Sequence, residues 1–187
     1  MHTAPLPLRQ RGTSLIEVLV TMVILAIGLL GVASLQARLQ LSEMEGYQRA
    51  QAMILLSDMS SRLSSNRSFA SSYVTGTTTP IGGTCPTATT TLAQRDLLDW
   101  CMALRGAGEK SGTNNVGAMI GGRGCIEQAG TNQYLVTVAW QGLGGITAPN
   151  SNLACARDLY NGTTGSACLL DRCRRVVTTL VRIAPLL

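Results

Sequence analysis

The stretch RQRGTSLIEVLVTMVILAIGLLG, residues 9–31, combines a basic start, an acid and a long apolar run. No charged residue occurs from Val18 to Ala37, a length of 20 residues. At about 1.5 Å of rise per residue, a helix of this length matches the roughly 30 Å hydrocarbon core of a membrane. Arg9 and Arg11 precede the run and would stay on the cytoplasmic side. The stretch therefore predicts a membrane-spanning helix, with the chain from residue 38 onward outside.

An acidic residue, Glu17, lies just inside the front edge of the apolar run. A cleaved secretory signal has an apolar region of only about 7 to 15 residues, so this run is too long for one. A simple membrane anchor explains the length but not the acid. A carboxylate costs on the order of 2.5 to 3.5 kcal/mol at the centre of a bilayer, and less near its surface. We therefore expect Glu17 to have a positively charged partner.

Cleavage of the chain after Gly12 would create such a partner. The new α-amino group of Thr13 would be a cation four residues before Glu17, since α-amino groups ordinarily titrate near pH 7.7 to 8.0. Within one chain the two groups pair weakly, as a carboxylate does near a helix N-terminus. Between neighbouring helices they would attract more strongly, because the dielectric constant is low there.

The segment RGTSLIEVLV, residues 11–20, resembles the class III signal of type IV prepilins, with Thr13 and Ser14 where Phe and Thr are usual in that family. The resemblance implies that a prepilin peptidase cleaves between Gly12 and Thr13. It also implies that Thr13 is then N-methylated, and that Glu17 pairs with the amino terminus of a neighbouring subunit during filament assembly.

Two further segments, ILAIGLLGVASLQARLQ (24–40) and YQRAQAMILLSDMSSRLSSNR (47–67), are similar to minor pilins of the PilV kind. This resemblance implies a minor pilin that helps to start or cap type IV pili, which serve twitching motility and adhesion. Its partners would be other minor pilins, the major pilin and the pilus assembly machinery. Before assembly it would lie in the inner membrane with a periplasmic head, and afterwards in the pilus. A minor pseudopilin of a type II secretion system carries almost the same signal and stays an alternative.

Helical periodicity continues beyond the apolar run, with apolar residues mostly three to five positions apart and no proline among them. We expect a single helix from about Leu15 to Ser64, which would be ~75 Å long. The predicted organisation is a cleaved leader (1–12), a membrane or filament-core helix (13–37), an amphipathic continuation of that helix (38–66) and an extracytoplasmic head (67–187).

The head is predicted to be a small mixed domain. Thr91 and Gln94 form a capping-box pattern that opens a short helix, and Gly106 ends it. The segment CIEQAGTNQYLVTVAWQG, residues 125–142, predicts a β-hairpin, and CRRVVTTLVRI, residues 173–183, predicts one more strand. The fold class is therefore α+β and type IV pilin-like, with a long N-terminal helix packed on a small antiparallel sheet and disulfides.

All six cysteines follow residue 84, in a segment rich in Gly, Thr and Asn. An even number of cysteines in an extracytoplasmic, loop-rich segment predicts disulfides rather than free thiols. No Cys-x-x-Cys pair occurs and no histidine lies nearby, so we expect no metal site. Several connectivities are possible, and among them we favour Cys85–Cys101, Cys125–Cys173 and Cys155–Cys168.

Catalysis is not expected. The only histidine is His2, which the cleaved leader would remove, and no paired-carboxylate motif occurs. We therefore expect no catalytic residue, no cofactor, no small-molecule substrate and no enzyme activity. The acidic residues interpreted as solvated surface groups are Asp96, Asp99, Glu109, Glu127 and Asp158.

A membrane-anchored binding module for DNA or for another surface is a further alternative. The net charge is +5, and Trp100, Arg123, Trp140, Arg174 and Arg175 are the residues that could form such a surface. We interpret the two tryptophans as core residues, and Arg174 and Arg175 as strand-edge charges. Nucleic acid is therefore not an expected partner.

Overall fold

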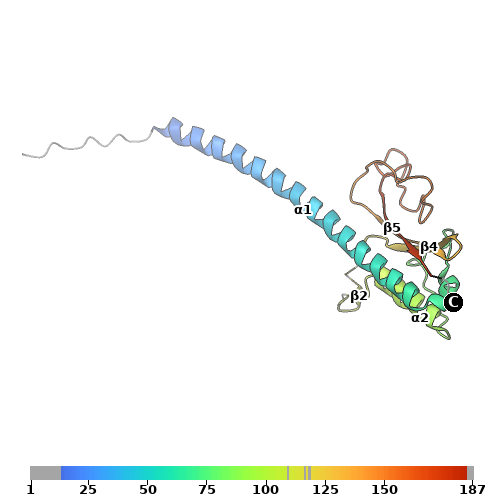
Figure 1. The fold of residues 1–187 in the computed structure, drawn as a ribbon. Coiled ribbons are helices and arrows are strands. Elements are labelled where there is room, and N and C mark those ends of the chain that lie inside the picture. Colours follow the sequence, from blue (N-terminus) through green and yellow to red (C-terminus); the bar gives the residue numbers. More distant parts are fainter. Residues whose placement is uncertain (1–13, 109, 116, 118, 185–187) are drawn as a thin grey trace, which may run out of the picture. The chain divides into compact units, whose positions relative to one another are not determined.

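The computed structural model describes residues 14–108, 110–115, 117 and 119–184, and Figure 1 shows the order of its helices and strands. The chain divides into two compact units, Met1–Ser42 and Glu43–Leu187. Helix α1 runs through the boundary between them. The described part of the first unit is thus mainly the beginning of α1, and the second unit contains the remainder of α1 together with the head.

Helix α1 spans Leu15–Ser65, which confirms the predicted single helix. In the second unit one of its faces is buried, and the buried residues recur at steps of three or four, as expected for 3.6 residues per turn. These residues are Gln48, Ala52, Leu56, Met59 and Leu63. The amphipathic half of α1 is therefore part of the core of the head. The predicted boundaries at residues 12, 37 and 66 stay predictions.

Two short helices follow, η1 (Arg67–Tyr73) and α2 (Leu92–Leu104). Both hydrogen bonds of the predicted capping box are present at the start of α2. The Gln94 N–H donates to Thr91 Oγ1 at 3.2 Å, and the Thr91 N–H donates to Gln94 Oε1 at 3.1 Å. Gly106 follows the helix with a φ of +77°, a conformation that glycine adopts without strain. The predicted short helix is confirmed, whereas η1 was not predicted.

The strands are β1 (Lys110–Ser111), β2 (Asn114–Asn115), β3 (Arg123–Gly130), β4 (Gln133–Gln141) and β5 (Arg174–Arg182). The main sheet is antiparallel with the order β3-β4-β5, which confirms the predicted hairpin and the predicted last strand. Strand β3 carries an irregularity between Gln128 and Gly130, whereas β4 and β5 pair without a shift in register. Strands β1 and β2 form a separate minimal hairpin.

The main core lies between the helices and one face of this sheet. Trp100 of α2 is fully buried, and its indole N–H donates to the Leu55 carbonyl of α1 at 2.9 Å. The indole ring reaches the backbone of β3 at Gly124, where an added Cβ would collide with the rings of Trp100 and with Leu104 Cδ1. Gly124 therefore allows α2 to approach the sheet closely.

A smaller core lies on the opposite face of the sheet, where the long segment between β4 and β5 packs. It contains Cys125, Ala139, Cys155, Ala156 and Tyr160. Because side chains alternate along a strand, Ala139 faces away from the main core to which its neighbours Val138 and Trp140 belong. The Tyr160 hydroxyl donates to the Gly121 carbonyl at 2.7 Å and so ties this segment to the residues before β3.

All six cysteines form disulfides, and Cys85–Cys101 is the pair predicted, with a Cα–Cα distance of 5.6 Å. The other two predicted pairs are wrong, because the structure joins Cys125 to Cys155 and Cys168 to Cys173. Cys125 and Cys173 cannot meet, since Cys125 is in β3, Cys173 directly precedes β5, and β4 lies between these two strands. Cys125 pairs with residue 137 of β4, whereas the Cys173 carbonyl accepts from residue 142, beyond the end of that strand.

The interpretation of Arg174 as a surface charge at a strand edge is also wrong. Its side chain is 1% exposed and pairs with Asp171 at 3.0 Å. Its Nη1 donates to the carbonyls of Leu153 and Cys155, at 2.7 and 3.0 Å. The Asp171 carboxylate in turn accepts from the Asp158 N–H at 2.8 Å. Through these partners the buried charge of Arg174 holds together the long segment between β4 and β5. The cysteine pattern of the sequence gives no sign of this contact.

We predict that Gly124→Ala lowers the free energy of unfolding by about 1 to 3 kcal/mol, because the methyl group overpacks the contact with Trp100. Gly130→Ala is the matched control on the same strand, since its nearest neighbouring atom would be 3.7 Å away. Urea unfolding of the full chain in detergent, followed by the fluorescence of the two buried tryptophans, measures both. Equal stability of the two variants would contradict the packing argument.

Candidate functional site

Glu17 lies in the first turn of α1, where the partial positive charge of the helix N-terminus favours a carboxylate. Its backbone N–H donates to the Ser14 carbonyl at 2.9 Å, a bond between residues three apart that closes the first turn of the helix. Its side chain is exposed, and so are the apolar residues Ile16 and Val18 on either side of it. The helix thus presents one acid at the start of an apolar surface.

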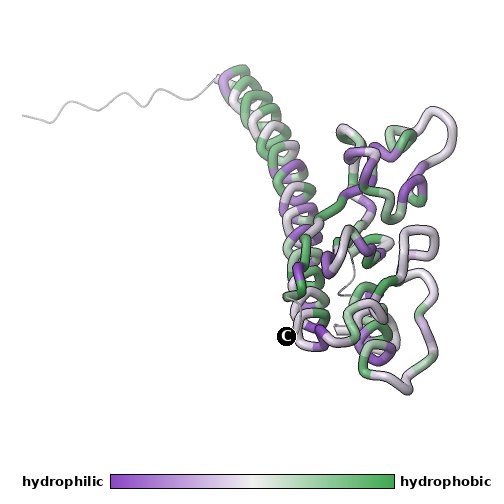
Figure 2. Tube along the Cα trace, turned by 45° about the vertical axis from the view of Figure 1, so that its right-hand side comes forward, coloured by the Kyte–Doolittle hydropathy of each residue, from purple (hydrophilic) through white to green (hydrophobic). Residues whose placement is uncertain are grey.

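In the first unit every residue of α1 is exposed, so apolar side chains are accessible on all sides of this part of the helix. Figure 2 shows the hydrophobic residues along it. Helix α1 is the one helix in the described part of the chain that is long and apolar enough to cross a membrane, and no part of its apolar window is buried. An apolar surface of this extent is covered by lipid or by other helices. Its large exposed side chains are Leu15, Ile16, Val18, Leu19, Val20, Met22, Val23, Ile24, Leu25, Ile27, Leu29, Leu30, Val32, Leu35, Leu39 and Leu41.

Gly12 and Thr13, the predicted cleavage position, lie outside the described residues. Cleavage between them, methylation of Thr13 and the pairing of its amino group with Glu17 therefore stay predictions. The structure describes the acid and the apolar helix that carries it.

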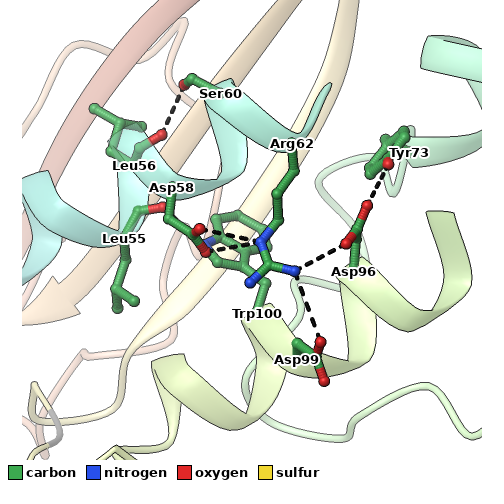
Figure 3. Close-up of polar contacts among 9 residues, drawn as sticks. All are labelled: Leu55, Leu56, Asp58, Ser60, Arg62, Tyr73, Asp96, Asp99 and Trp100. Atoms are coloured by element: carbon green, nitrogen blue, oxygen red, sulfur yellow. Dashed lines mark hydrogen bonds and ion pairs between the residues drawn. The ribbon is translucent and has the colours of Figure 1, made fainter. Parts of the chain in front are cut away.

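A cluster of charged groups joins the end of α1 to η1 and α2 (Figure 3). Arg62 donates from Nε to Asp58 Oδ2 at 3.0 Å and from Nη1 to Asp96 Oδ1 at 2.8 Å. The Tyr73 hydroxyl donates to the other oxygen of Asp96 at 2.5 Å. Asp99 lies 3.7 Å from Arg62 Nη1, but its side chain is 66% exposed. Asp96 is therefore shared by α1 and η1, and it fixes both elements to α2.

The same cluster shifts the pKa of two of its members. Burial raises the pKa of Tyr73 to about 12, and the hydrogen bond to Asp96 adds to the rise. Burial opposes the charged form of Arg62, but hydrogen bonds to Asp58 and Asp96 outweigh it and raise its pKa. Because the folded-state pKa of Tyr73 exceeds the unfolded value of about 10, its contribution to stability is complete below about pH 10. That contribution is lost as the pH rises towards 12.

Of the acidic residues singled out in the sequence, Asp96 and Asp99 lie on α2, Glu127 lies on β3, and Asp158 lies in the long segment between β4 and β5. The interpretation of Asp96 as a surface group is wrong, because it is buried beside Arg62. Asp99 and Asp158 are exposed as expected, and Glu127 on β3 is half-buried, with its pKa raised by that burial. Glu109 lies outside the described residues. Within the described part of the chain, no group of His, Cys, Asp and Glu side chains is arranged to hold a metal ion.

The structure places the five residues considered for a nucleic-acid surface in different surroundings. Trp100 and Trp140 are core residues, as expected. Arg175 pairs with Glu45 of α1 at 3.1 Å, so it joins the last strand to the helix. Arg174 is buried, and Arg123 donates to the carbonyl of its neighbour Gly122 at 2.9 Å.

Sequence reasoning missed the Arg62 cluster and the Arg174 cluster. Each contains one local signal, since Asp58 and Arg62 are four residues apart on a helix and Asp171 and Arg174 are three apart. The contact of Arg62 with Asp96 joins residues 34 positions apart. Only the assembled fold brings such residues together.

Residues 7–33 match the family model of the prokaryotic N-terminal methylation motif. This match supports a type IV pilin-type protein. The prepilin-like signal implies processing by a prepilin peptidase and a context of pilus-type assembly. Together with the apolar part of α1, it indicates membrane anchoring. No curated protein and no solved structure matches the chain.

We predict that Asp96→Ala lowers the free energy of unfolding by about 1 to 3 kcal/mol, because it removes the shared partner of Arg62 and Tyr73. Asp99→Ala is the matched control on the same helix and should change stability by less than about 1 kcal/mol, since its ion pair is exposed. Urea unfolding of the full chain in detergent at neutral pH compares them. Equal losses would show that Asp96 has no special role.

Proposed function

We propose that this protein is a minor pilin that joins type IV pili and helps to start or cap them. The observation that carries the proposal is Glu17 in the first turn of an exposed apolar helix, within the segment that matches the methylation motif. The proposed role is structural and does not include an enzyme activity. The proposed partners are the major pilin, other minor pilins and the assembly machinery.

The driving force follows from the chemistry of α1. In the inner membrane its apolar side chains contact lipid, and in a filament they contact the apolar helices of other subunits. Because this exchange alone changes little hydrophobic free energy, a polar contact must favour the filament. The Glu17 carboxylate and the amino group of a neighbour's Thr13 supply it, since opposite charges attract strongly where water is excluded.

The head is suited to a place outside the membrane. Three disulfides reinforce a domain whose sequence contains only one Phe and two Trp, and each bridge stabilises such a small domain by about 2 to 4 kcal/mol. Disulfides persist in an oxidising compartment. We therefore place the head in the periplasm before assembly and on the pilus afterwards.

We predict that Glu17→Ala leaves cleavage of the leader intact but reduces the amount of this subunit in sheared pili at least about tenfold, the equivalent of roughly 1.4 kcal/mol. Glu43→Ala is the matched control, because Glu43 is an exposed acid of the same helix beyond the apolar run. Immunoblots of membranes and of sheared pili measure both quantities. Normal recovery of the Glu17→Ala subunit in pili would contradict the proposed contact.

Deletion of the protein separates a pilus from a secretion pseudopilus. The proposal requires loss of surface pili and of twitching, with secretion of exoproteins unchanged. Normal piliation with impaired secretion would instead assign the protein to a type II secretion system.

A further inference from the structure

The two edges of the main sheet differ in how they are protected. The outer edge of β3 is covered, because the Ile81 N–H and carbonyl both bond to Gly124 at 2.8 Å and the Thr75 N–H donates to the Ile126 carbonyl at 3.0 Å. Strand β3 also carries a bulge before its end. Covering segments and bulges are the usual means by which a sheet edge is kept from pairing with another chain.

The outer edge of β5 has neither kind of protection over Val176–Arg182. The Ile183 N–H donates to Asn132, which continues the β4–β5 register, so the odd-numbered residues of β5 direct their backbone groups to β4. The N–H and C=O groups of Val176, Thr178, Leu180 and Arg182 therefore point outward. Among the described residues, none forms a hydrogen bond with these outward groups.

The sequence of this edge favours pairing. It reads VVTTLVR, with β-branched residues at most positions, no proline and no shift in register. The side chains of Thr178, Leu180 and Arg182 are exposed. A regular, exposed edge of this kind is a template for an additional strand.

The charge of the edge indicates what kind of strand fits. Strand β5 contains no acid. Arg182 ends the strand and Arg172 lies two residues before its start, and their exposed side chains take part in no ion pair within the described part of the chain. A second copy of β5 would fit poorly. An antiparallel copy would bring Arg182 near the arginines at residues 172–175. A parallel copy in register would place the two Arg182 side chains next to each other. Like charges in these positions are destabilising.

We propose that the β5 edge, Val176–Arg182, accepts an extended strand from a different subunit, and that this strand carries acidic residues at its ends. The inference rests on the proposed function for the source of the strand, which would be another component of the same assembly. Backbone hydrogen bonds to the outward groups of Val176, Thr178 and Leu180 would supply the pairing, and Arg172 and Arg182 would select the acidic partner.

The test uses the full chain in detergent and two labelled peptides of about eleven residues, which match the extended span from Arg172 to Arg182. Each peptide has alternating valine and threonine, with either glutamate or lysine at both ends. Thr178→Pro removes an outward N–H without removing a bond to β4, and Thr178→Val is the matched variant that retains the N–H. We expect the glutamate peptide to bind the wild type and Thr178→Val, and to bind Thr178→Pro at least about tenfold more weakly. Arg182→Glu should weaken binding of the glutamate peptide and improve binding of the lysine peptide.

Three results would overturn the proposal. These are no binding of the glutamate peptide to the wild type, equal binding to Thr178→Pro, and self-association of the wild type through this edge. Amide hydrogen exchange keeps the test decisive if Thr178→Pro fails to fold. The amides of Thr178 and Leu180 should exchange rapidly in the wild type alone and at least about tenfold more slowly with the glutamate peptide, and unchanged exchange would reject the proposal.

The outcome is separable from that of the proposed function. Glu17→Ala should bind the glutamate peptide like the wild type, since residue 17 is not part of the β5 edge. If Glu17→Ala is not incorporated into pili but still binds the peptide, the result supports the Glu17 contact and says nothing about the β5 edge. If the wild type is incorporated normally but does not bind the peptide, the proposal for the β5 edge is wrong and the proposed function is unaffected.

Discussion

A single carboxylate lies at the start of an apolar helix, and the proposed role of the protein depends on it. Glu17 lies in the first turn of α1, before about twenty residues without a charge, and the apolar side chains of α1 are exposed throughout the described part of the first unit. Such a surface requires lipid or other helices, and such an acid requires a cation. A processed amino terminus at Thr13, four residues before Glu17, would supply this cation, whereas an ordinary membrane anchor would not. The combination of acid and apolar surface therefore favours a helix that exchanges lipid for neighbouring subunits.

The same helix belongs to the head. The residues from Gln48 to Leu63 on one face of α1 are in the core, and Arg62 joins α1 to α2 through Asp96. On the other side of the sheet, Arg174 and the Cys125–Cys155 disulfide hold the long segment between the last two strands. These contacts hold α1, α2 and the long segment in place within the head. Buried, multiply bonded charges are suited to this role because breaking one partner leaves the other unpaired.

Local sequence signals predicted the two α-helices and the three strands of the main sheet but not η1, β1 or β2, and tertiary packing decided the rest. The ends of α2 and the hairpin follow from a capping box, a glycine and β-branched residues, so short-range chemistry was sufficient there. The first disulfide was predicted, but the pairing of Cys125 depends on β4 lying between it and Cys173, which no spacing along the chain reveals. Asp96 and Arg174 resembled surface charges because their partners come from distant segments or from backbone carbonyls. At the N-terminus, the role of Glu17 was predicted from an acid inside an apolar run and from the distance between this acid and Gly12. The positively charged partner of Glu17 is still a prediction.

The pairing of Glu17 with a processed amino terminus is tested most directly by the mass of the N-terminal peptide of the native protein, measured on subunits from membranes and from sheared pili. The account predicts a chain that begins at Thr13, with its α-amino group retained as a cation next to Glu17. A native chain that still carries Met1, or one that begins beyond the apolar part of α1, would contradict it.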